Sequence, residues 1–289
     1  MNKIFTAVLV CFSLFGLSSV EAQNVTDSSK AVPEKEGFSP AIEDNSFLIE
    51  EAYNQEERVV QHISTLMYTR KPDEAYFYTF TQEWPAGGQL HQLSYTIPYT
   101  YIKSTKANGI GDIMLNYRYQ LLGHDDWMAA APRLSFILPT GSTSKGLGSG
   151  NYGLQLNLPF SKRLSNYFVA HLNAGMTAGF VSYNGPEDKT IVRLKPSYFW
   201  GGSLIWLLSS NFNLMLEYLN NINGEFNYNY DLEFGQIEFS HVSIINPGLR
   251  FAININELQI VPGFCTPITI SSEGSHMDVF FYLSFEHPF

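Results

Sequence analysis

The sequence predicts an all-β protein: a transmembrane, antiparallel up-and-down β-barrel of about twelve strands with both termini in the periplasm. Three observations support this prediction. The first residues have the form of an export signal, the composition is poor in charge and rich in aromatic residues, and apolar and polar residues alternate over long segments. Only 15% of the 289 residues are charged, against roughly 25% in an ordinary soluble domain, so coiled coils and helical bundles are excluded.

Residues 1–22 have the features of a secretory signal peptide. Lys3 precedes an apolar stretch over residues 4–17, and a Val-x-Ala ending indicates cleavage after Ala22. Cleavage leaves Cys265 as the single cysteine, which excludes an internal disulfide and a cysteine-type zinc site. Because no other group of potential ligands has the spacing of a metal site, we expect no metal and no cofactor.

The charge balance and the hydropathy narrow the class of protein further. The chain has 17 basic and 27 acidic residues and a formal net charge of −10, so it lacks the basic patch of a nucleic-acid-binding protein. Beyond residue 17 no run of about 18 apolar residues follows, so no transmembrane helix is predicted. An exported, strand-rich chain of this kind is either a soluble β-sandwich or an outer-membrane barrel.

Residues 23–56 form an acidic segment that differs from the rest of the chain. The segment holds eight acidic residues against two lysines, includes prolines and shows no strand alternation. Such a composition is typical of a flexible segment. Two interpretations stay open: a tether that precedes the barrel, or a plug that folds into its lumen.

The alternation from residue 57 onward favours the barrel over the sandwich. Over residues 111–122, Ile, Leu and Tyr occupy the odd positions, whereas Asp, Met, Asn, Arg and Gln occupy the even ones. Residues 152–164 and 168–180 repeat this alternation. The polar face consists mainly of small uncharged residues and arginine, which suit a lumen, and the apolar face suits lipid. A sandwich would instead place Lys, Glu and Asp on its outer face.

The lengths of the turns give the number of strands. Short connections are predicted at 85–88, 123–126, 165–166, 209–211 and 254–256, and longer ones at 70–75, 104–110, 140–150, 183–190, 224–236 and 271–276. This alternation is typical of periplasmic turns and extracellular loops, and it yields about twelve strands within residues 57–289. One alternative stays open at residues 58–69, whose apolar spacing fits either a strand or an amphipathic plug helix.

The last segment predicts the compartment. Val279, Phe281, Leu283, Phe285 and Phe289 share one strand face. An aromatic residue at the end of such a strand resembles the signal that the outer-membrane barrel assembly machinery recognises. We therefore expect a protein of a Gram-negative outer membrane, whose partners are the membrane lipids and, through Phe289, this assembly machinery.

An ordered series of short motifs resembles a known family. The motifs are Phe-Thr-Gln-Glu-Trp-Pro at 80–85, His-Gln-Leu-Ser-Tyr-Thr-Ile-Pro at 91–98, Gly-Ile-Gly-Asp at 109–112 before Asn-Tyr-Arg-Tyr at 116–119, Pro-Arg-Leu-Ser at 132–135, Leu-Pro-Thr-Gly at 138–141 and Leu-Gly-Ser-Gly at 147–150. Over residues 75–289 the series resembles the outer-membrane proteins grouped with a MetA pathway of phenol degradation. The resemblance implies a transporter-like barrel for small, aromatic or apolar compounds.

The strand register assigns a set of polar side chains to the lumen, where they would line the solute path. They are Asp112, Arg118, Arg133, Gln155, Asn157, Arg163, His171, Asn173, Arg193, Lys195, Glu217 and Arg250. Basic residues outnumber acidic ones in this set, which predicts a preference for anionic or carboxylated solutes. The alternative is that the arginines pair with Glu217 and its neighbours and brace the interior. Because a barrel of about twelve strands has a narrow lumen, we predict a channel through which small solutes diffuse.

Two other classes of function are compatible with a barrel. His241 and Ser243 are two residues apart, hence on one strand face, and an outer-membrane phospholipase uses a His-x-Ser pair of this kind. Ile244 and Ile245 follow where that enzyme has Asn-Gly, and the sequence assigns no third residue to orient the histidine. A hydrolase and a structural or adhesive barrel are therefore the alternatives, and we predict that the chain is not an enzyme.

Overall fold

The computed structural model describes residues 46–289 except 124, 185–189 and 230–233. The predicted signal peptide and residues 23–45 therefore lie outside the described residues. Within the described ranges, no helix is both long and apolar enough to cross a membrane.

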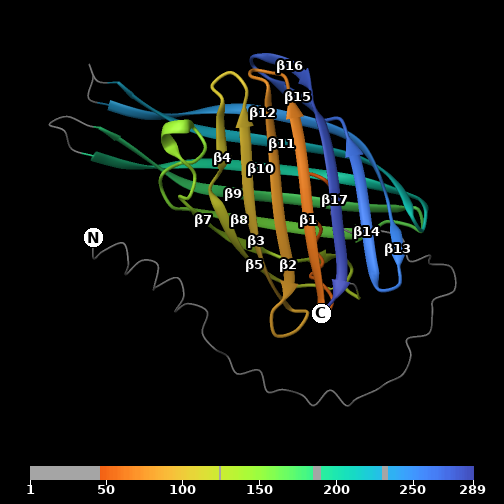
Figure 1. Ribbon diagram of the computed structural model, residues 1–289. Helices are drawn as coiled ribbons and strands as arrows, with labels where there is room; N and C mark the ends of the chain where they lie inside the picture. The colour runs from red at the N-terminus through yellow and green to blue at the C-terminus, as the bar shows by residue number, and fades with distance from the viewer. Residues whose placement is uncertain (1–45, 124, 185–189, 230–233) are drawn as a thin grey trace. The chain divides into compact units, whose positions relative to one another are not determined.

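All strand segments belong to one antiparallel sheet that closes on itself. The segments are β1 (Val59–Thr69), β2 (Ala75–Pro85), β3 (His91–Ile102), β4 (Ala107–Ile110), β5 (Ile113–Tyr119), β6 (Ala129–Ala130), β7 (Arg133–Leu138), β8 (Gly153–Arg163), β9 (Phe168–Asn184), β10 (Thr190–Ser209), β11 (Phe212–Asn229), β12 (Phe234–Phe251), β13 (Ile253–Ile255), β14 (Leu258–Cys265), β15 (Ile268–Ser271), β16 (Gly274–Met277) and β17 (Val279–Pro288), with the 3₁₀ turn η1 (Thr143–Lys145) between β7 and β8. β1 pairs with β17 from Val59 opposite Pro288 to Tyr68 opposite Val279. The wall is therefore a closed up-and-down barrel (Figure 1).

The barrel has the twelve strands that the sequence predicts. Five wall strands consist of two consecutive segments each, namely β4–β5, β6–β7, β12–β13, β14–β15 and β16–β17. Residues 59–69 form a strand that pairs with β2 on one side and with β17 on the other, so the helical alternative for this stretch is wrong. The physical reason is that the sheet would have two open edges without β1, and closure satisfies the backbone groups of both.

Burial follows the predicted alternation, with the apolar face outside. In β8, Leu154, Leu156 and Leu158 keep 38–40% of their surface exposed, whereas Asn157 and Ser161 on the opposite face are 1% exposed. A soluble barrel would bury the leucines and expose the polar groups. The inverse arrangement is that of a wall between lipid and a polar lumen.

The wall is taller on one side than on the other. β9, β10, β11 and β12 have 17, 20, 18 and 18 residues, whereas β1, β2 and β3 have 11 or 12. The two hairpins that they form project beyond the rest of the barrel in Figure 1. The long loop predicted at 224–236 is therefore wrong, because the ladder between β11 and β12 continues up to Asn229 and Phe234. The loop predicted at 183–190 is shortened for the same reason, to the stretch between Asn184 and Thr190.

The two ends of the wall meet at the end of the barrel that carries the short turns. The backbone N–H of Phe289 donates to the carbonyl of Arg58 at 2.9 Å, beside the closing pair of β1 and β17. The residues just before this point, 46–57, contain no strand. Their hydrogen bonds connect them to side chains on the inner face of the wall, so this stretch lies in the lumen.

Candidate functional site

Residues 46–57 form an inner segment within the lumen. Ile49 is 1% exposed, Ala52 0% and Asn54 5%, although no strand or helix includes them. A buried backbone that pairs with no strand must find other acceptors for its amide groups. The inner segment finds them in polar side chains of the wall.

Consecutive backbone amides of the inner segment donate to successive parts of the wall. The bonds are Leu48 N to Glu217 Oε1 at 2.8 Å, Ile49 N to Glu217 Oε1 at 3.1 Å, Glu50 N to Asn173 Oδ1 at 2.9 Å, Ala52 N to Ser161 Oγ at 2.7 Å, Asn54 N to Gln120 Oε1 at 2.8 Å and Gln55 N to Gln92 Oε1 at 2.7 Å. Because four of these acceptors stand on β11, β9, β8 and β3, and Gln120 directly follows β5, the segment is held around much of the lumen.

Glu217 is a fully buried acceptor of two of these bonds. Its side chain is 1% exposed, and it receives a third hydrogen bond from Asn246 Nδ2 at 2.5 Å. A buried carboxylate is costly unless donors surround it. Here two backbone amides of the inner segment and one wall amide supply those donors, so the segment and the carboxylate satisfy each other.

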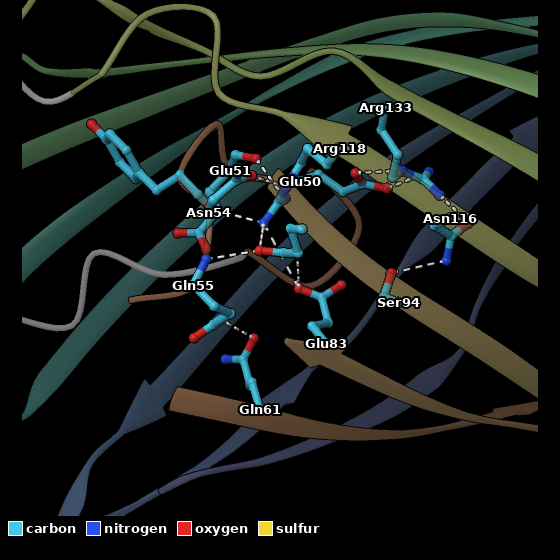
Figure 2. A network of polar contacts seen from close by, with 12 residues as sticks. Glu50, Glu51, Asn54, Gln55, Gln61, Glu83, Ser94, Asn116, Arg118 and Arg133 are labelled. Atoms are coloured by element: carbon cyan, nitrogen blue, oxygen red, sulfur yellow. Dashed lines mark hydrogen bonds and ion pairs between the residues drawn. The ribbon is translucent and has the colours of Figure 1, made fainter. Parts of the chain in front are cut away.

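Arg118, on another part of the wall, donates hydrogen bonds to backbone carbonyls of the inner segment. Its guanidinium, on β5, donates to Asn54 Oδ1 at 3.0 Å, to the carbonyl of Glu51 at 3.2 Å and to the carbonyl of Tyr53 at 2.7 Å. Glu83 Oε2 lies 3.8 Å from the same guanidinium. Figure 2 shows these groups converging between the segment and the wall. Burial of the Tyr53 side chain raises its pKa to about 12, with a smaller contribution from Glu51.

Arg133 holds a side chain of the inner segment instead of its backbone. The Glu50 carboxylate binds it in a bidentate manner, through Nε at 2.9 Å and through a terminal nitrogen at 2.5 Å. The remaining N–H groups of Arg133 donate to Asn116 Oδ1 at 2.9 Å, Ser135 Oγ at 2.7 Å and Gln155 Oε1 at 3.0 Å. All five donors of the guanidinium are therefore used, as Figure 2 shows in part.

Apolar packing anchors the start of the inner segment. The ring of Phe47 lies 5.8 Å from that of Phe280 and 5.4 Å from that of Tyr282, measured between centroids. It fits against two glycines of the wall, and a Cβ atom on Gly248 would lie 2.6 Å from Phe47 Cε2. A Cβ atom on Gly263 would lie 2.7 Å from Phe47 Cζ. Both approaches are too close for a Cβ atom while the ring stays in place, so the two glycines form a notch in the wall for this ring.

Leu48 lines a central and an upper cavity within the described part of the barrel. The central cavity, of about 350 Å³, is lined among others by Ile63, Thr81, Glu83, Arg118, Arg133 and Phe280. The upper cavity, of about 370 Å³, reaches the long-loop end and is lined among others by Met67, Lys71, Phe77, Ile102, Ile244 and Pro267. Of the inner segment, Leu48 alone contacts both the mainly apolar upper cavity and the central cavity, which carries paired charges.

The structure brings together most of the side chains that the sequence assigns to the lumen. Arg118, Asn157, His171, Asn173, Glu217 and Arg250 are buried there, and Arg133 and Gln155 are bonded to each other beside them. The sequence did not identify the partners of these residues in the inner segment, Phe47, Glu50 and Asn54. An apolar Phe-Leu-Ile run at 47–49 within the acidic stretch was the available signal.

Four of the predicted lumen residues lie apart from this cluster. Asp112 accepts hydrogen bonds from the backbone amides of Gly141 and Ser149 and so fixes a long loop. Arg163 donates to backbone carbonyls of the short turn at 165–166. Arg193 is exposed and Lys195 half-exposed on the projecting part of β10. Alternation predicts the face of a residue but not its height along the strand.

The predicted His-x-Ser pair is on the outer face of β12. Ser243 shares its strand face with Ile245, which is 38% exposed, and opposes the face of Asn246, which is fully buried. Asn220 Nδ2 donates to Ser243 Oγ at 2.9 Å, whereas no hydrogen bond between Ser243 and His241 is found among the described residues.

Solved structures with a similar fold are outer-membrane barrels. An outer-membrane channel from Pseudomonas putida F1 superposes with a TM-score of 0.57 over 82% of this chain and 98% of its own, at 11% sequence identity. The NanC porin superposes with a TM-score of 0.50 over 80% of this chain and 100% of its own, at 7% identity. These likenesses show the fold. No family model and no curated protein matches the sequence, so the resemblance to the phenol-degradation family stays a prediction.

Proposed function

We propose that the protein is a channel of a Gram-negative outer membrane through which small solutes diffuse. The observation that carries this proposal is that a closed wall with a polar inner face encloses cavities of about 350 and 370 Å³, both of which contact Leu48 of the inner segment. The similar solved structures are described as an outer-membrane channel and a porin. The predicted signal peptide, the lipid-suited outer face and the terminal strand with Phe289 agree with this compartment and with assembly by the barrel machinery.

The solutes of this proposal are small compounds that combine an apolar or aromatic body with a carboxylate. The upper cavity, lined by Met67, Phe77 and Ile102, favours an apolar body. The central cavity, lined by Arg118 and Arg133, favours an anionic group. The resemblance to proteins of phenol degradation points in the same direction. On this view, the buried polar residues of the lumen line the solute path.

The inner segment is the plug of this channel. Ser46–Glu50 line the central cavity and Leu48 also lines the upper one. Hydrogen bonds hold the segment within the lumen at five parts of the wall. A solute that crosses the barrel must therefore pass or displace it.

Single-channel recording on the refolded protein, residues 23–289, in a planar bilayer tests the channel. Discrete conductance steps are expected, with anion preference in a salt gradient. A correctly folded barrel that stays silent, both with the inner segment and without it, would refute the proposal. Cation preference would refute the proposed class of anionic solutes but would not refute the channel function.

One observation favours a second candidate, a hydrolase on the outer face. Asn220 donates to Ser243 at 2.9 Å, and His241 shares the face of Ser243. A nucleophile needs a base within hydrogen-bond reach, and His241 would have to turn toward Ser243 to provide it. Ester hydrolysis by refolded protein that is lost in Ser243→Ala would support the hydrolase, and activity that survives Ser243→Ala would exclude it.

A further inference from the structure

We infer that Arg133 is a carboxylate-binding site of the channel wall and that Glu50 occupies it as an internal ligand in place of a solute. The inference rests on the proposed channel function and narrows its substrate to a small organic monocarboxylate with an apolar body. Its basis is the geometry of Arg133, the accessibility of Glu50 and the charge balance of the central cavity.

Hydrogen bonds to wall residues alone orient the guanidinium of Arg133 to bind a carboxylate. Asn116, Ser135 and Gln155 accept three of its five N–H groups at 2.7–3.0 Å, and all three belong to wall strands. These bonds fix the plane of the guanidinium. The two donors that remain, on Nε and on one terminal nitrogen, point the same way and form the fork that matches a carboxylate.

Glu50 fills this fork with a side chain that can leave it. The Glu50 side chain is 32% exposed, while that of Arg133 is 11% exposed. The backbone of Glu50 is held independently, because Asn173 accepts from its N–H at 2.9 Å and donates to its carbonyl at 2.7 Å. The carboxylate can therefore rotate away while the inner segment stays in place.

The balance of formal charges around the central cavity favours an anion at the Nε and terminal N–H groups of Arg133. Arg118, Arg133, Glu50 and Glu83 all line the cavity, and their formal charges cancel. If the Glu50 carboxylate moves into solvent, the balance becomes positive. An incoming monocarboxylate restores it, whereas a neutral solute does not.

The cavity beside the fork suits the rest of such a molecule. Ile63, Phe280 and Tyr282 line its other side, and its volume of about 350 Å³ lies at the small end of ligand pockets. A carboxylate bound to Arg133 would thus place a short alkyl or aromatic group against an apolar surface.

Equilibrium binding of ¹³C-carboxyl benzoate, followed by NMR on the refolded protein in detergent micelles, tests the site. Benzyl alcohol serves as the neutral analogue. Glu50→Gln is expected to lower the dissociation constant of benzoate about tenfold, because it removes the internal competitor. Glu56→Gln, which makes the same charge change at an exposed position of the same segment, is the matched control and should bind as the unmodified protein does. Arg133→Lys keeps the charge but loses the fork, and should lose most of the binding.

Three results would overturn the site: equal affinity of Glu50→Gln and Glu56→Gln, equal binding of benzoate and benzyl alcohol, or unchanged binding in a folded Arg133→Lys. If Arg133→Lys does not fold, the comparison of Glu50→Gln with Glu56→Gln and that of benzoate with benzyl alcohol still test the site. Binding requires no conduction. A protein that conducts without binding benzoate refutes the site alone, and one that binds benzoate in a silent barrel refutes the channel alone.

Discussion

The wall of the barrel and the inner segment are stabilised by different kinds of hydrogen bond. In the wall, backbone pairs with backbone along unbroken ladders, as from Trp206 opposite Phe168 to Thr190 opposite Asn184. In the inner segment, backbone amides bind side chains such as Glu217 and Asn173. A ladder depends on no single side chain, whereas each bond of the inner segment depends on one. The segment should therefore be released by single substitutions that leave the wall intact.

The largest effect is expected from deletion of residues 23–57. The ladders of β1 with β2 and β17 begin after this stretch, so the barrel should still close. Conductance should rise several-fold, because the lumen loses its plug while its diameter is set by the strand number. Single-channel recording measures the change, and circular dichroism checks the fold.

Deletion of residues 23–45 is the matched control, since it shortens the chain but leaves the inner segment in place. It should conduct like the unmodified protein. Equal conductance of the two deletions would contradict the role of the inner segment as the plug.

The next largest effect is expected from Glu217→Ala. The substitution removes the acceptor of Leu48 N and Ile49 N, and each buried amide without a partner costs about 1–3 kcal/mol. Hydrogen exchange of the amides of residues 47–50 should become at least tenfold faster, while exchange in β9 and β10 stays slow. Glu257→Ala, at an exposed turn position, provides the control. Uniform acceleration across the wall would mean that the segment and the wall are not separable.

The wall was predictable from the sequence because its signal is local. Alternation with a period of two is set by the strand itself, so Leu154, Leu156 and Asn157 reveal their faces without any knowledge of their partners. The closing strand at 59–69 was harder, since its apolar spacing also fits a helix, and only its pairing with β17 decides.

The inner segment was not predictable in the same way, because its contacts are non-local. Ile49 and Glu217 are 168 residues apart in the chain, and a stretch without periodicity carries no information about its partners. Gly248 and Gly263 lie on the inner face of the wall, and their backbone pairing in the ladder is regular. The ring of Phe47 explains why Gly263 lacks a side chain, and together with Cys265 Cβ it explains the same for Gly248. Alternation predicts that Arg133 points into the lumen. The orientation of its guanidinium depends on acceptors from three separate strands, which alternation does not reveal.

An intermediate effect is expected from Gly263→Ala. The new methyl group would collide with the ring of Phe47, whereas its next neighbour, Arg250 Cβ, would be 3.4 Å away. The ring should leave its notch, and hydrogen exchange of residues 47–50 should accelerate by less than in Glu217→Ala. Phe47→Ala supplies the matching variant. Because the double variant has no collision, its exchange should equal that of Phe47→Ala alone, and a double-mutant cycle measures this coupling. Additive effects of the two substitutions would contradict the notch.

The smallest effect is expected at the rim, from Glu74→Gln. Lys103 Nζ donates to Glu74 Oε2 at 2.6 Å, and their side chains are 60% and 33% exposed. This hydrogen bond lowers the pKa of Glu74 below its ordinary value of 4.5. The contribution of the pair to stability is therefore present above that value and is lost as the pH falls through the lowered pKa. Exposed pairs contribute little, so the melting temperature of Glu74→Gln at pH 7 should differ only slightly from that of the unmodified protein, and the difference should vanish at pH 2. Neither wall ladders nor the inner segment involve this pair. A large shift of the melting temperature at pH 7, or one that persists at pH 2, would thus contradict the small contribution expected of this exposed pair.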